Sequence, residues 1–273
     1  MLNDHSKWFV AKTVFLNNRM SAYKAYIRYA QEKGYQVISL EDFYNLSDRR
    51  IAGERHFVLR HDVDHPGIST RKMFDVEREC GVTSNYYFRF STIDKPLIAD
   101  MKQAGFQVGL HFETISDYIK EKGCTDKREI DIDLMRRRLT EDIKRFEDIV
   151  GFKTVSCCSH GDPVNKKLGI SNNAIVEGAD MTQFGLMFEA YDARLYETSV
   201  DCHVMDRTIL FNYGFAYRHN PYEAINQAHQ NIVFLSHPHN WYSEGGRYFK
   251  DIIKLILGRA TYSTDSEFVR IRQ

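Results

Sequence analysis

The segment HDVDH, residues 61–65, places two histidines and two aspartates within five positions, directly after an apolar run and directly before a proline. If the segment continues a strand, Asp62 and Asp64 project from one face about 7 Å apart, because side chains at i and i+2 share a face. Their charges repel each other, and a bound cation would offset that repulsion. One carboxylate could then hold a divalent metal while the other accepts a proton from water.

A plainer interpretation of the same segment is an ion pair. Arg60 lies on the same face of a regular strand and could pair with one aspartate, which would fix the loop. Such a pair would also hold that aspartate in its ionised form. The structural and the chemical interpretations are therefore compatible.

Four of the 11 histidines each end a different apolar run. They are His61 after FVLR, His111 after FQVGL, His160 after TVSCCS and His237 after IVFLS. The carboxyl ends of parallel barrel strands share one face, so these side chains would converge there. A single histidine beside a strand is more often structural, but four at equivalent positions with two carboxylates favour a metal or acid–base site.

The segments that must position these residues alternate between the two-residue periodicity of strands and the 3.6-residue periodicity of helices. Alternation of strands with helices favours a parallel sheet, and the number of units favours a barrel over an open doubly wound sheet. We therefore expect an α/β fold with a single domain over 1–273. Strands are expected at 35–40, 56–61, 83–90, 106–111, 153–160, 186–191 and 231–237, and helices at 21–33, 70–80 (capped by Ser69), 95–104, 135–150 and 222–230.

Composition narrows the choice of partners. The chain has 273 residues, and its 37 basic and 37 acidic side chains cancel, with no basic block that would favour nucleic acid or an anionic membrane. No stretch approaches the roughly 20 apolar residues of a membrane span, and the N-terminus shows no cleavage signal. The five cysteines form no C-x-x-C pair, so we expect reduced, buried thiols and a cytoplasmic, soluble protein.

Four motifs in this order resemble a known family. LRHDVDHP, VGLHFET, SCCSHGDP and LSHPHNW, spread over about two thirds of the chain, look like the polysaccharide deacetylase family, carbohydrate esterase family four. The first motif resembles the H-D-V-D branch often associated with surface-polysaccharide biosynthesis. The resemblance implies a distorted (β/α) barrel and a divalent metal, commonly Zn²⁺. It also implies hydrolysis of N-acetyl groups on amino sugars in a saccharide or glycoconjugate precursor.

The same resemblance implies roles for individual residues. Asp62 matches the catalytic base, Asp64 and His111 match metal ligands, and His237 matches the general acid. Trp241 is then either a wall of the sugar pocket or an ordinary core aromatic.

The chain departs from the family at the second metal histidine. That residue would fall at Thr114 or Ile115, and neither side chain can replace an imidazole. His160 is the substitute we expect because its strand ends on the same face, and His65 and Glu113 are the alternatives. The family's arginine-containing motif is also missing, so Arg60 or Arg89 is expected to orient the site or bind substrate.

Two other functions stay open at this stage. One is a metal-dependent hydrolase of a non-sugar amide, and the other is a sugar-binding or scaffolding protein that has lost catalysis. The missing second histidine favours the latter, whereas the retained pair of aspartates and His237 favour the enzyme. The sequence indicates no oligomeric state.

Overall fold

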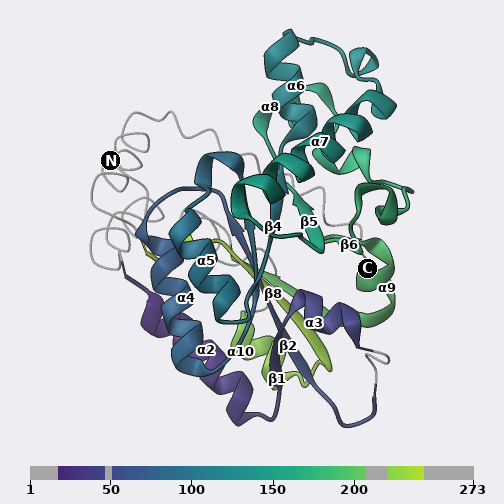
Figure 1. The fold of residues 1–273 in the computed structure, drawn as a ribbon. Coiled ribbons are helices and arrows are strands. Elements are labelled where there is room, and N and C mark those ends of the chain that lie inside the picture. Colours follow the sequence, from purple (N-terminus) through teal and green to yellow (C-terminus); the bar gives the residue numbers. More distant parts are fainter. Residues whose placement is uncertain (1–17, 47–50, 207–219, 243–273) are drawn as a thin grey trace, which may run out of the picture.

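The computed structural model describes residues 18–46, 51–206 and 220–242 (Figure 1). In these residues, parallel strands form one sheet of order β6-β5-β4-β3-β2-β8-β7, and β1 pairs with β2. The strands are β1 (Gln36–Ser39), β2 (His56–Val63), β3 (Asn85–Phe88), β4 (Gln107–Phe112), β5 (Ser156–Ser159), β6 (Phe188–Glu189), β7 (Cys202–Met205) and β8 (Asn231–Ser236).

Helices fill the connections between successive strands. Figure 1 shows α2, α4 and α5 on one side of the sheet and α6, α7 and α8 together beyond β4 and β5. The α-helices are α2 (Met20–Glu32), α3 (Leu40–Asn45), α4 (Ile68–Cys80), α5 (Lys95–Gln103), α6 (Thr114–Lys122), α7 (Ile132–Val150), α8 (Pro163–Leu168), α9 (Ala193–Ser199), α10 (Pro221–Asn226) and α11 (Pro238–Trp241). The 3-10 helices are η1 (Phe90–Thr92), η2 (Lys127–Glu129), η3 (Asn172–Ile175) and η4 (Met181–Phe184). Within the described residues, no helix has both the length and the apolar character needed to cross a membrane.

Strand β2 is the centre of the sheet and the source of its irregularity. One edge of β2 pairs with β1 along His56–Leu59 and then with β3 along Arg60–Val63, while the other edge pairs with β8. The terminal strands β6 and β7 do not pair with each other in the described residues, so the barrel is incomplete. The prediction of an α/β fold with a distorted (β/α) barrel is confirmed.

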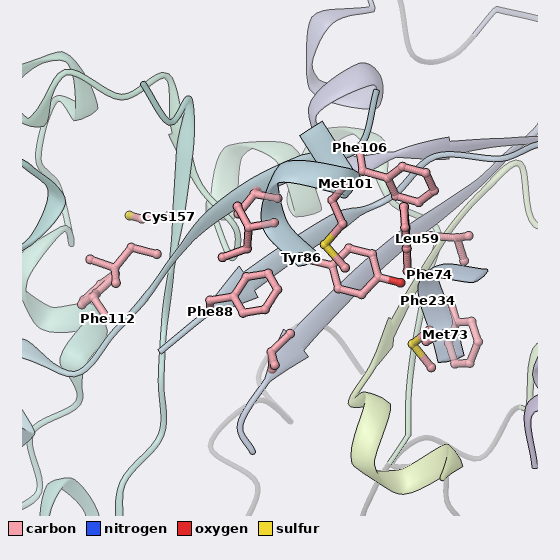
Figure 2. Close-up of a cluster of buried hydrophobic side chains, with 14 of the residues drawn as sticks. Leu59, Met73, Phe74, Tyr86, Phe88, Met101, Phe106, Phe112, Cys157 and Phe234 are labelled. Carbon is pink, nitrogen blue, oxygen red and sulfur yellow. The ribbon is translucent and has the colours of Figure 1, made fainter. Parts of the chain in front are cut away.

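Alternation along each strand separates two apolar clusters. On β2, Phe57 and Leu59 pack in the larger cluster under the helices, whereas Val58 packs in a smaller cluster with Tyr87 and Val233 from neighbouring strands. Figure 2 shows part of the larger cluster, including side chains from β2, β3, α4 and α5. We call the face of the smaller cluster the inner face. Arg60 and Asp62 share this face with Val58, because residues at i and i+2 point the same way.

A buried carboxylate on the other face holds β2 and β3 against α4. Glu77 is fully buried and accepts hydrogen bonds from the hydroxyls of Ser84 and Tyr86 at 2.9 and 2.7 Å. The Nε2 atom of His61 lies 2.6 Å from the same carboxylate, and its Nδ1 lies 2.8 Å from the Ser236 hydroxyl. His61 is thus a structural residue that joins β2, β8 and α4, and it points away from the inner face.

Element boundaries differ from the sequence-based expectation in several places. Helix α4 begins at Ile68 after Gly67, so the expected cap Ser69 lies inside the helix. Helix α5 begins at Lys95 as expected, and Asp94 caps it by accepting a hydrogen bond from the Leu97 amide. Helix α10 ends at Asn226, four residues early, and is followed by a turn in which Ala228 has a φ of 58°. Strand β7 and helix α6 were not expected, and β6 is reduced to two residues.

Gly109 on β4 lies where the inner face has no room for a side chain. A Cβ there would lie 2.8 Å from the ring of Tyr87 and even closer to the carbonyl oxygen of Ser156. Because neither neighbour can move without disturbing the sheet, Gly109→Ala is expected to lower the free energy of unfolding by about 1–3 kcal/mol. Urea unfolding monitored by circular dichroism measures this change.

Gly161→Ala is the matched control, because no atom lies within 4 Å of the added Cβ. Its effect on the free energy of unfolding is expected to stay within about 0.5 kcal/mol. Equal stabilities of the two variants would mean that the packing around Gly109 is looser than described.

Candidate metal and acid–base site

The carboxyl ends of four strands carry the polar side chains of the site. Asp62 lies near the end of β2, and Asp64 follows the strand. His111 lies near the end of β4, while His160 and His237 directly follow β5 and β8. The parallel strands bring these ends to one edge of the sheet, as expected for His111, His160 and His237. His61, which was expected to join them, instead points to the other face and bonds Glu77.

Three histidines each place a ring nitrogen close to the carboxylate of Asp64. Its Oδ1 atom lies 3.4 Å from Nε2 of His111 and 3.5 Å from Nε2 of His160, and its Oδ2 lies 3.7 Å from Nε2 of His237. The Nδ1 atom of His111 faces the carbonyl oxygen of Cys158 at 3.0 Å. A proton on Nδ1 satisfies that carbonyl and leaves the Nε2 lone pair directed at the site.

The Asp64, His111 and His160 donors fit a divalent cation. Their ligand atoms lie within 4.8 Å of one another, and Asp64 Oδ1 is buried without a hydrogen-bond partner in the described residues. A buried anionic oxygen is costly unless it is compensated. Burial alone would raise the pKa of Asp64, yet the nearby imidazoles of His111, His237 and His160 hold it well below its usual value. The side chain is therefore a carboxylate, which is the form that binds metal.

A second group of possible donors, Asp62, His111 and Cys158, is less suited to a metal. The guanidinium of Arg60 lies 3.0 Å from Oδ2 of Asp62 and 2.9 Å from Sγ of Cys158. Burial also raises the pKa of the Cys158 thiol well above its usual value, so thiolate is disfavoured. A cation in this position would lie beside an existing positive charge.

The third group consists of Glu113, His160 and Asp162. Its two carboxylates are already paired with basic side chains. Glu113 accepts two hydrogen bonds from Arg89, each 2.7 Å long, and Asp162 lies 2.5 Å from the ammonium of Lys120. Among the described residues, the carboxylate of the Asp64, His111 and His160 group has no arginine or lysine paired with it and instead faces His237, whose Nε2 lies 3.7 Å from Oδ2.

Arg60 is a buried partner of Asp62. It is fully buried, and its Nε and Nη2 atoms donate to the two oxygens of Asp62 at 3.2 and 3.0 Å. Its Nη1 donates to the carbonyl oxygen of Ala190 at 3.0 Å, and the ring of Tyr191 lies 3.8 Å from its central carbon. An arginine in this position orients Asp62, and its burial corrects the expectation that it binds substrate directly.

The charge of Arg60 decides the ionisation state of Asp62. Burial alone would raise the pKa of Asp62, but Arg60, followed by His111 and His237, holds it below its usual value. Asp62 is thus an anion, and one of its oxygens lies 3.7 Å from Nε2 of His111. A carboxylate in this state beside the donor group can accept a proton.

His237 is held by a carboxylate that the sequence analysis missed. Asp206 accepts from Nδ1 of His237 at 2.6 Å and from its backbone amide at 2.9 Å. Burial alone would lower the pKa of His237, but Asp206 raises it to about 10. His237 is therefore protonated at neutral pH and has a proton to donate.

Trp241 is a second side chain that holds Asp206 in place. Its indole N–H donates to Asp206 Oδ2 at 2.8 Å, and its ring is only 4% exposed and packs near Tyr23 and Phe234. Of the two interpretations offered by the sequence, the core aromatic therefore fits better than the pocket wall. The sequence signal for Asp206 was an aspartate at the end of a strand, but that strand, β7, was not expected.

The remaining sequence candidates lie around the donor group. Thr114 and Ile115 begin α6, where the Thr114 hydroxyl bonds Asp142 and Ile115 is buried, so neither faces the donors. The ring of His65 packs edge-on against His239 with centroids 4.5 Å apart, and His65 belongs to none of the donor groups in the described residues.

Comparison with known proteins gives only distant similarity. No family model and no curated protein matches the sequence. Among solved structures, the chain resembles a CE4 family pseudoenzyme from Bacillus anthracis with 13% identity and a TM-score of 0.42, over 77% of this chain and 63% of that one. A mutant pseudoenzyme of the CE4 family with restored enzymatic activity gives 11% identity and a TM-score of 0.42, over 77% and 65%.

A family 4 carbohydrate esterase from Streptomyces lividans in complex with acetate gives 14% identity and a TM-score of 0.40, over 75% of this chain and 89% of that one. The chain spans less than two thirds of the length of the two pseudoenzyme structures. At these values the likeness assigns no family, and the chemistry of the site rests on its own geometry.

Proposed function

We propose that this protein is a metal-dependent hydrolase that removes an N-acetyl group from an amino sugar in a cytoplasmic saccharide or glycoconjugate precursor. One observation carries the proposal: the buried Oδ1 of Asp64, which has no hydrogen-bond partner among the described residues, lies between two imidazole nitrogens, with a carboxylate and a protonated histidine beside it. One carboxylate and two imidazoles are a ligand set that suits zinc. The sugar substrate is suggested by the motifs HDVDHP, SHGDP and SHPHNW in the sequence.

Asp62 acts as the base in this proposal. A divalent cation, when bound, polarises a carbonyl oxygen and makes nearby water more acidic. Arg60 keeps Asp62 ionised and holds both of its oxygens, so the carboxylate is oriented before substrate binds. An aspartate with a low pKa is a weak base, and it would be adequate where a cation held by Asp64, His111 and His160 made the water more acidic.

His237 acts as the acid. Its Nδ1 is held by Asp206, which leaves Nε2 facing the site 3.7 Å from Asp64. When the amide C–N bond breaks, Nε2 donates its proton to the departing sugar amine, and acetate is the second product. A protein that only binds sugar needs neither this protonated histidine nor an oriented carboxylate, which favours the enzyme.

The rest of the saccharide is proposed to extend into a pocket beside the segment that follows β2. This pocket has a volume of about 450 Å³ and is lined by the loop before α4, the end of β3 and the start of α5, including His65, Phe88 and Lys95. None of the donor residues lines it, and His65, the residue after Asp64 in the chain, links it to the donor group. The volume of the pocket falls within the range of about 300–1,000 Å³ that is usual for ligand pockets.

Substitutions of the two aspartates of the HDVD motif are expected to affect different properties, kcat for Asp62 and metal content for Asp64. Asp62→Asn should retain metal but lower kcat by about 10²–10⁴-fold, because the base is lost. Asp64→Asn should lower metal content itself. Acetate release from a panel of N-acetylated amino sugars and elemental analysis of the zinc-loaded protein measure the two properties.

Asp62→Asn also leaves the Arg60 charge buried without its partner, and such losses typically cost about 3–5 kcal/mol. The double variant Arg60→Met, Asp62→Asn removes the whole pair, so it is expected to recover stability but not activity. Wild-type turnover in either folded variant would exclude Asp62 as the base. Absence of turnover by the zinc-loaded wild-type protein on every sugar would favour the binding protein.

Asp206 and His237 are expected to act as one unit. Asp206→Asn should lower kcat with little change in metal content, because Asp206 holds the imidazole and stabilises its charged form. In a His237→Ala background the same change should have little further effect, since residues in one catalytic unit are not additive. Steady-state kinetics of the two single variants and the double variant test this coupling. Additive losses would mean that Asp206 acts elsewhere.

A further inference from the structure

His160 directly follows β5, and its two ordinary hydrogen bonds among the described residues are both made by its backbone. Its amide donates to the carbonyl oxygen of Phe112 at 3.0 Å, and its carbonyl oxygen accepts from the side chain of Asn172 at 2.7 Å. These bonds fix the Cα atom but do not by themselves set the orientation of the imidazole, which packs edge-on against the ring of His111 with centroids 5.0 Å apart. Its Nδ1 atom is buried and makes no hydrogen bond of ordinary geometry in the described residues.

The nearest carboxylate is in position to satisfy that nitrogen. Oε1 of Glu113 lies 3.4 Å from Nδ1 of His160, on the side of the ring opposite Nε2 and Asp64. A ligating histidine usually donates its other ring N–H to a carboxylate or a carbonyl, which fixes both tautomer and orientation. His111 already has such a partner in the carbonyl oxygen of Cys158.

Arg89 holds Glu113 in place and connects it to the first ligand. Its Nε and Nη2 atoms donate to the two oxygens of Glu113, and its Nη1 donates to the backbone carbonyl of Asp64 at 3.0 Å. The side chains of Arg89 and Glu113 are only 20% and 11% exposed, so water screens this fork weakly. One guanidinium therefore ties the Asp64 backbone to the carboxylate that faces His160.

We propose that Arg89 and Glu113 are positioning residues for His160. Glu113, held by Arg89, accepts a hydrogen bond from the Nδ1–H of His160, and this bond turns the Nε2 lone pair toward the metal. This inference rests on the metal of the proposed function. It also gives Glu113 a role other than that of a ligand, because both of its oxygens are already held by Arg89.

The test compares the zinc affinity of the full-length protein and its variants by competition with a chromophoric chelator. Glu113→Gln is expected to weaken zinc binding by about 10–100-fold, the usual cost of losing such a partner. In a His160→Ala background the same change is expected to have no further effect, which general destabilisation would not produce. Arg89→Lys, which cannot hold both carboxylate oxygens, is the second variant and is expected to weaken binding in the same direction.

Nitrogen-15 spectra of the zinc-loaded protein give a readout independent of affinity. In the wild type, His160 is expected to carry its proton on Nδ1, and in Glu113→Gln that resonance should shift or be lost. Asp162→Asn is the matched control, because Asp162 belongs to the neighbouring donor group and pairs with Lys120. It should leave zinc affinity unchanged.

The outcomes separate this inference from the proposed function. A wild-type protein that binds no zinc overturns both. Zinc binding that is unchanged by Glu113→Gln, with an unchanged His160 resonance, overturns the positioning role alone. Equal losses of affinity in Glu113→Gln and Asp162→Asn would instead make Glu113 a ligand in the third donor group.

Discussion

The site depends on how negative charge is compensated at the end of an otherwise apolar sheet. Asp62 is buried against Arg60, and Asp206 is buried against His237. Burying a carboxylate without such a partner costs several kcal/mol. Asp64 Oδ1 is the exception, because it is buried and unpartnered in the described part of the chain. Two paired carboxylates around one oxygen that is left without a hydrogen bond are what we expect of a pocket that holds a cation.

Topology explains why residues so far apart in the sequence meet. Strand β2 carries the motif at the centre of the sheet, and parallel pairing places the ends of β4, β5 and β8 on the same edge. His111, His160 and His237 also have the parity that points to the inner face, as do Arg60 and Asp62 on β2. His61 has the opposite parity and bonds Glu77 under the helices. The pleat of the strands thus directs these five side chains to one face of the sheet.

The sequence was sufficient for the barrel and for the convergence of three of the four strand-end histidines, because periodicity and parallel topology are local or general features. His61 was the exception, because its position in β2 points it to the other face. The sequence was not sufficient to predict the side chains that pair with the site residues. Asp206 was missed because β7 is only four residues long and was not expected. The roles of Arg60 and Glu113 depend on side-chain pairing across the fold, which spacing does not reveal. Trp241 looked equally suited to pocket or core, and only its 4% exposure and its bond to Asp206 favour the core.

The central claim is that one cation binds between Asp64, His111 and His160. Anomalous diffraction at the zinc edge, from crystals of the zinc-loaded protein, tests it most directly. The account predicts one strong peak about 2.0–2.2 Å from a carboxylate oxygen of Asp64 and from Nε2 of both histidines. A peak between Asp62, His111 and Cys158, or no peak at this end of the sheet in protein shown to contain zinc, would contradict it.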